Sequence, residues 1–173
     1  MCTRFRQRYW TLRNLQKNGF SVPELVQVYK TMIRPIAEYA CVAFHSSYTD
    51  EQDERIERLQ DNALKCIFGP GISARKMRAQ ADLPTLRARR IDLADKFAKK
   101  CAGSGRFHHW FPRKENRRSS RAGNNEVFLE ERARCNRLMN SPIFYFRRRL
   151  NGKEGKTYGA RNREYREDYP NQN

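Results

Sequence analysis

The chain has 173 residues, and its 36 Lys and Arg against 19 Asp and Glu give a net charge of +17. That length suffices for one ordinary domain with a hydrophobic core, and the excess of positive charge favours polyanionic partners. The sequence contains no run of about 18 apolar residues that could span a membrane, and no secretory signal at its start.

The composition predicts a compact part joined to a solvated part, because 32% of the residues are charged and the mean hydropathy is -0.97. The cysteines are odd in number and widely spaced, and no two of them form C-x-x-C. This pattern indicates reduced thiols, so we expect an intracellular protein of the cytoplasm or nucleus. The same spacing argues against a structural zinc site, which needs close ligand pairs.

The first predicted helix covers residues 4–18, where Phe5, Tyr9, Leu12 and Leu15 follow helical spacing and Gly19 supplies a stop. This helix begins almost at the first residue without a cap. We therefore expect the chain to be cut from a longer one.

The second predicted helix starts at Ser21, which forms a capping box with Glu24. Its apolar stripe continues in phase past Pro35. Proline removes a backbone donor, so the sequence predicts a kink or restart there.

From Pro35 to Phe44 nearly every residue is apolar. A segment that is apolar all round is expected to be buried all round, so this run is predicted to form the centre of the core. Glu38 interrupts the run, and the simplest expectation is an ion pair with Arg34 four residues earlier.

A second capping box, formed by Thr49 and Gln52, opens a helix that ends at Gly69. A shorter helix is predicted over residues 73–81, and a longer one over residues 86–101 follows the break at Leu83-Pro84-Thr85. No segment alternates with a period of two, so no sheet is expected.

The predicted fold class is therefore all-α, a small thumb-like bundle of about five helices over residues 1–112. Residues 113–173 are predicted to be a basic, largely disordered C-terminal tail. Short helical or anchored patches are expected within it, around Val127–Leu129 and Ile143–Phe146.

Five segments, in order, resemble blocks of non-LTR retrotransposon polyproteins of the jockey type. The matching segments are VYKTMIRPIAEYACVAF, ERIERLQDNALKCIFG, ADLPTLRARRIDLADKFAKKC, RFHHWFP and RCNRLMNSPIFYFRRRLN. In that family these blocks follow the palm of the reverse transcriptase and form its helical thumb and the start of its C-terminal tail. The resemblance covers residues 4–150 and implies a fragment of an RNA-directed DNA polymerase.

The resemblance also implies what this chain lacks. A reverse transcriptase holds two metal ions on palm aspartates in an aromatic-x-D-D turn. This sequence has no such turn, and its REDYP segment holds Asp168 alone. We therefore expect no enzymatic activity and no cofactor in this chain, since magnesium would belong to the missing palm.

The candidate site is a set of basic residues that would contact phosphates without reading bases. The alternative for each is an ordinary solvated charge, and for the last three a disordered charge run. The candidates are Arg75, Lys76, Arg78, Arg87, Arg89, Arg90, Arg147, Arg148 and Arg149.

The aromatic segment from Phe107 to Phe111 has two interpretations. It could stack on unpaired bases, or it could anchor the chain to the core after the last long helix. The anchoring interpretation is favoured, because Phe and Trp mostly pack in cores.

Two functions follow. The first is a non-catalytic thumb that grips the backbone of a DNA or RNA–DNA duplex without sequence preference. The second is a helical interaction module whose apolar stripes dock a missing palm domain or another partner, or promote self-association. An independent hydrolase has no nucleophile–base pair to support it.

Overall fold

The computed structural model describes residues 2–113, 127–130 and 134–152, and these residues are overwhelmingly helical. The predicted all-α class is confirmed. Within the described residues the β pairing is limited to an isolated bridge between Arg113 and Phe128. Of the tail predicted to be largely disordered, residues 113–173, the structure describes residues 113, 127–130 and 134–152, which include two helices, and the rest lies outside the described residues.

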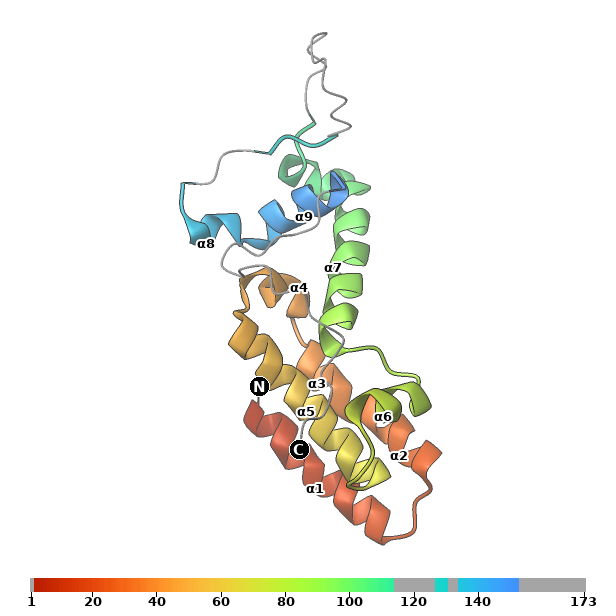
Figure 1. Ribbon diagram of the computed structural model, residues 1–173. Helices are drawn as coiled ribbons and strands as arrows, with labels where there is room; N and C mark the ends of the chain where they lie inside the picture. The colour runs from red at the N-terminus through yellow and green to blue at the C-terminus, as the bar shows by residue number, and fades with distance from the viewer. Residues whose placement is uncertain (1, 114–126, 131–133, 153–173) are drawn as a thin grey trace.

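The molecule is elongated, with α7 leading from one group of helices to the other (Figure 1). The elements, in chain order, are α1 Cys2–Lys17, α2 Val22–Val28, the π-helical turn η1 Tyr29–Ile33, α3 Arg34–Glu38, α4 Cys41–Phe44, the 3-10 turn η2 His45–Ser47, α5 Asp50–Phe68, α6 Ala74–Gln80, α7 Leu86–Ala102, the 3-10 turn η3 Gly105–Trp110, α8 Asn136–Met139 and α9 Pro142–Leu150.

Local sequence signals set the helix starts. The backbone N–H of Ser21 donates to the Glu24 carboxylate at 2.8 Å, which caps α2. Thr49 and Gln52 exchange hydrogen bonds at the start of α5, at 3.1 and 3.3 Å. The predicted break at Pro35 is confirmed, since the chain passes through η1 and restarts as α3.

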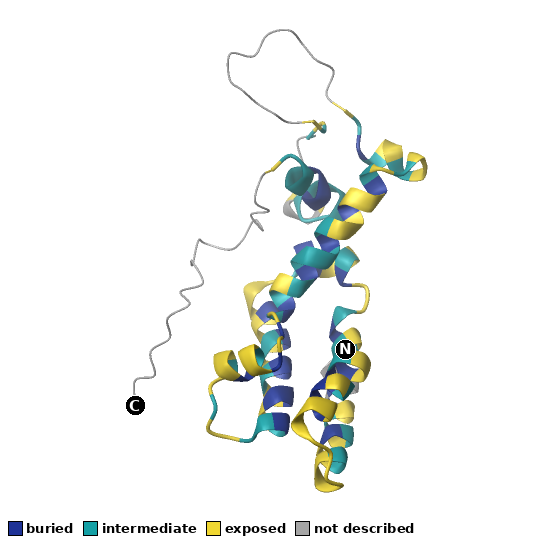
Figure 2. Ribbon diagram, turned by 90° about the vertical axis from the view of Figure 1, so that its right-hand side faces the viewer, coloured by how far each residue is buried: buried dark blue, intermediate teal, exposed yellow. Residues whose placement is uncertain are grey.

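The first core cluster lies between α1, α2, α5 and α6, with α3 and the start of α7 closing it. Its buried side chains include Phe5, Leu12, Leu25, Tyr29 and Leu64. Dark blue residues line the facing sides of these helices in Figure 2, while their outer sides are exposed. This burial is the main favourable term that holds the bundle together.

A second core cluster joins the later half of α7 to η3 and α9. Its buried members are Ala94, Ala98, Cys101, Phe111, Tyr145 and Phe146. Residues on both sides of the predicted boundary at 112 share this cluster. The patch predicted around Ile143–Phe146 is thus a helix packed on α7.

The prediction that residues 35–44 form the centre of the core is wrong. Ala37 and Cys41 are buried, but Tyr39 is 79% exposed and Phe44 is 54% exposed. The helix stops after Glu38, and Ala40 takes a left-handed conformation with φ 52°. An apolar run is buried on all sides only if neighbours cover every side, and the described helices cover one side of this run.

A row of polar side chains on α5 holds the start of α7. Positions 53, 57 and 60 share one face of the helix. The Glu57 carboxylate accepts the backbone N–H groups of Leu86 at 3.2 Å and Arg87 at 2.6 Å. Gln60 donates to the carbonyl of Pro84 at 3.0 Å and accepts from the Tyr29 hydroxyl at 3.1 Å.

The third member of the row, Asp53, forms an ion pair with Arg90, whose side chain is fully buried. Burial raises the pKa of Asp53, an effect that the guanidinium groups of Arg90 and Arg87 oppose. The Arg90 guanidinium also lies 5.5 Å from the centre of the Tyr48 ring. The two core clusters are therefore joined around a buried charge pair.

Asp53→Ala is expected to lower the free energy of unfolding by about 3–5 kcal/mol, because it leaves the Arg90 charge buried without its partner. Urea denaturation followed by circular dichroism measures this. Glu51→Ala is the matched control, since it removes the exposed partner of Arg55 on the same helix and should cost less than about 1 kcal/mol. Equal losses for the two variants would contradict the proposed role of the buried pair.

His45 lies beside this pair, buried against the ring of Tyr145 at a centroid distance of 5.2 Å. Burial lowers the pKa of His45 to about 4, and the nearby Arg90 and Arg87 charges act in the same direction. The folded protein therefore holds this imidazole neutral in the pH range where an unfolded chain protonates it.

Stability should consequently be lost as the pH falls from about 6.5 toward 4, because the unfolded state binds the proton first. Between pH 7 and pH 5, His45 is expected to contribute about 2 kcal/mol of this loss. Urea denaturation of the wild type and of His45→Gln at both pH values measures this contribution. The change in unfolding free energy between the two pH values is compared for the two proteins, so that the effects of the other titrating groups cancel. An equal loss of stability between the two pH values in the wild type and in His45→Gln would contradict this assignment.

Candidate nucleic-acid interface

The structure divides the predicted phosphate-binding residues by what their side chains already contact. On α6, Arg78 forms an ion pair with Asp61 at 2.7 Å. Arg75 and Lys76 are exposed in the first turn of the same helix and have no acidic partner among the described residues. These two remain candidates for phosphate contact.

The three candidates on α7 face inward or pair with carboxylates. Arg90 is fully buried, so the prediction that it contacts phosphate is wrong. The reason is its position one turn from Leu86 on the stripe of α7 that faces the cores. The Nε atom of Arg87 lies 3.7 Å from a carboxylate oxygen of Asp53, and the Nε atom of Arg89 lies 3.2 Å from a carboxylate oxygen of Glu38.

Glu38 accounts for another predicted interaction. Its carboxylate lies 3.2 Å from Arg34, so the predicted ion pair is confirmed. The same oxygen also meets Arg89 of α7, which the sequence did not indicate. Glu38 thus clamps α3 to α7, and no catalytic role is needed to explain a carboxylate in the apolar run.

The three arginines of α9 are ordered in its last turn and contact other parts of the fold. Arg147 donates to the Trp110 carbonyl at 2.6 Å, and Arg148 donates to the Met139 carbonyl at 2.9 Å. Arg149 pairs with Asp95 of α7. The interpretation of these residues as a disordered charge run is therefore wrong, since they fasten α9 to its neighbours.

A different group of cations gathers where α1 and α5 end. Arg13 and Lys17 of α1 and Lys65 of α5 line a shallow hollow of about 310 Å³ beside Gly69 and Pro70. This is the lower end of the molecule in Figure 1. We name these three residues, Arg13, Lys17 and Lys65, the distal cation cluster.

All three side chains of the distal cation cluster are exposed, and none forms an ion pair within the described parts of the chain. Like charges that line one hollow raise the local positive potential. The cluster is therefore an accessible concentration of positive charge.

The candidates chosen from the sequence include no member of this cluster. Arg13 and Lys17 are spaced four residues apart, so they share a helix face, and that spacing is visible in the sequence. Lys65 is far away along the chain. Only the packing of α1 beside α5 brings it to the same hollow.

The aromatic segment after α7 anchors the chain, as favoured from the sequence. Phe111 is buried in the second core cluster, and Phe107 and Trp110 pack against it. The rings of Phe107 and Trp110 lie 4.7 Å apart. His108 and His109 are exposed, and among the residues described no group of His, Cys, Asp and Glu side chains could hold a metal ion.

None of the helices in the described ranges combines the length and apolar character required to cross a membrane. No protein-family model matches the chain, and neither a curated protein nor a solved structure is significantly similar to it. Function is therefore argued from the site itself.

Proposed function

We propose that this chain binds the sugar–phosphate backbone of nucleic acid without sequence preference. The partner is a DNA or RNA–DNA duplex, held as the thumb of a non-LTR retrotransposon reverse transcriptase holds it. The observation that carries this proposal is the distal cation cluster, in which exposed Lys and Arg side chains from α1 and α5 line one hollow and form no ion pair among the described residues. The net charge of +17 and the ordered sequence blocks support it.

The chemistry of the cluster favours backbone contact over base reading. Lys and Arg are donors only, and their long side chains adapt to phosphates along a curved backbone. Gly69 and Pro70 in the lining carry no polar side chain, and Gln16 is the lining residue whose amide could meet a base edge. Each phosphate neutralised would release condensed counterions, so binding is expected to be strongly salt-dependent.

Catalysis is not proposed for this chain. Polymerase chemistry requires palm aspartates with bound magnesium, and the sequence contains no aromatic-x-D-D turn that could supply them. In this proposal the chain positions nucleic acid, and a palm domain would supply the metal ions.

The double change Lys17→Ala and Lys65→Ala is expected to weaken binding to a mixed-sequence duplex at least about tenfold at low salt. It should also reduce the slope of log affinity against log salt by about 2, one for each lost phosphate contact. Fluorescence anisotropy with a labelled duplex, titrated at several sodium chloride concentrations, measures both quantities.

The matched control is Arg55→Ala with Arg58→Ala. It removes the same charge from exposed positions of α5, but these arginines are already paired with Glu51 and Glu54. Binding that is insensitive to salt, or an equal loss in both double variants, would overturn the assignment to the distal cation cluster. Competition by duplexes of unrelated sequence should be equally effective.

A further inference from the structure

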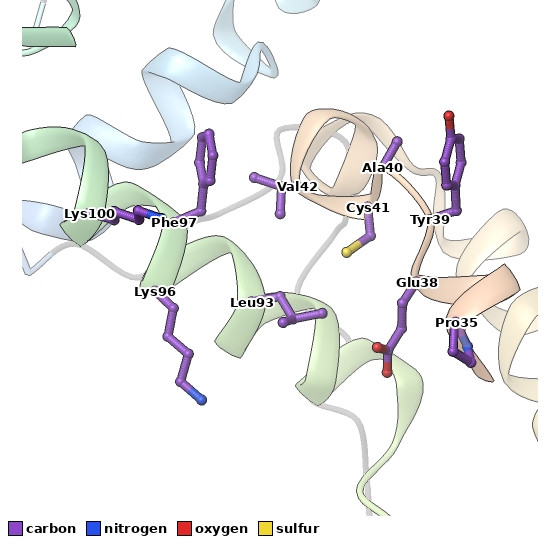
Figure 3. Close-up of a pocket in the computed structure, with 10 residues that line it drawn as sticks. All are labelled: Pro35, Glu38, Tyr39, Ala40, Cys41, Val42, Leu93, Lys96, Phe97 and Lys100. Carbon is purple, nitrogen blue, oxygen red and sulfur yellow. The ribbon is translucent and has the colours of Figure 1, made fainter. Parts of the chain in front are cut away.

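A second surface lies beside residues 35–44, the segment that was predicted to form the centre of the core. The exposed side chain of Tyr39 belongs to this surface. A hollow of about 460 Å³ is lined by residues of α3, α4 and α7 and of the turn between α3 and α4. In Figure 3 the rings of Tyr39 and Phe97 stand at its two ends, and Val42, Cys41 and Leu93 lie between them. Apolar side chains therefore form its floor and both of its ends.

The hollow is held open by the structure around it. Glu38 is fixed by Arg34 and Arg89, each at 3.2 Å, which ties α3 to α7 below the hollow. The left-handed turn at Ala40 re-aims the chain into α4, and Cys41 is buried behind it. A partner would therefore meet a surface already shaped for it.

The charges around this hollow have a positive excess. Glu38 is neutralised by two arginines, and Asp92 pairs with Lys96 at 2.8 Å and lies 3.6 Å from Arg89. Lys100, which lines the hollow, is exposed and forms no ion pair in the described part of the chain. An apolar floor with an unneutralised cationic rim is complementary to a ligand that is apolar in its centre and acidic at its edge.

We propose that this hollow docks an acidic amphipathic segment of another protein, with its apolar side chains against Val42 and Leu93 and its carboxylates facing Lys100. This interface uses α3, α4 and α7, so it is independent of the proposed nucleic-acid contact at the ends of α1 and α5.

A second copy of the chain and a nucleobase fit the hollow less well than an acidic segment does. A second copy of the chain would bring another net charge of +17 toward a rim that is already positive. A nucleobase needs a flat partner for stacking. The two rings stand at opposite ends of the hollow, and aliphatic side chains form the floor between them (Figure 3).

The test is an NMR titration of the isotope-labelled chain with a helical probe peptide that carries leucine on one face and glutamate on the others. Shift changes are expected in residues 35–42 and 93–100. Tyr39→Ala and Phe97→Ala should each weaken peptide binding about tenfold, as expected for aromatic residues at an interface. Lys100→Glu should weaken it about fivefold through charge repulsion.

Phe20→Ala is the control, since Phe20 is also an exposed aromatic but lies in the turn between α1 and α2; it should leave peptide affinity unchanged. A peptide with the same leucines and lysine in place of glutamate should not bind. Equal binding of the lysine peptide, or shift changes outside the two segments, would overturn the proposal.

Two further outcomes would reassign the surface. A dimer in sedimentation that is lost in Tyr39→Ala would identify a second copy as the occupant. Displacement of the peptide by a single-stranded oligonucleotide would identify nucleic acid. Duplex affinity in Tyr39→Ala should equal that of the wild type. A negative result in the peptide experiment therefore does not affect the proposal for the distal cation cluster, which the salt titration tests separately.

Discussion

The contact between the polar row of α5 and the start of α7 is the constraint on which the rest of the structure depends. Asp53, Glu57 and Gln60 bind Arg90, two backbone N–H groups and the Pro84 carbonyl respectively. Because α7 contributes to both core clusters, fixing its first turn also fixes the direction in which it leaves the bundle. Burying charge is costly, so this junction is stable only with every partner present.

The junction also explains why net charge is a poor guide to the position of an interface. Many arginines of this chain serve the fold: Arg90 is buried with Asp53, Arg149 pairs with Asp95, and Arg147 binds the Trp110 carbonyl. Arginine suits these roles because its planar group donates several hydrogen bonds at once. The charge left for the proposed nucleic-acid contact comes from side chains near helix ends, such as Lys17 and Lys65, that form no ion pair among the described residues.

The two proposed surfaces occupy different parts of the elongated molecule and differ in chemistry. The distal cation cluster is polar and open, as suits a phosphate backbone. The hollow beside Tyr39 is apolar with a cationic rim, as suits a protein segment. A chain that binds nucleic acid at one place and a protein at another would connect the two, and the independence of their residues allows each to be removed without the other.

The sequence by itself determined where α2 and α5 begin and where α5 ends. Helix signals act over a few residues, so they can be recognised in the sequence. They are the capping boxes at Ser21 and Thr49, the restart near Pro35 and the stop at Gly69.

Tertiary structure alone decided which charged and apolar side chains are free of partners. Arg90 and Arg78 look like surface cations until Asp53 and Asp61 are brought beside them. Likewise, residues 35–44 look like a core until the left-handed turn at Ala40 leaves Tyr39 and Phe44 uncovered. The physical reason is that burial and ion pairing depend on neighbours distant along the chain, whereas capping and helix termination do not.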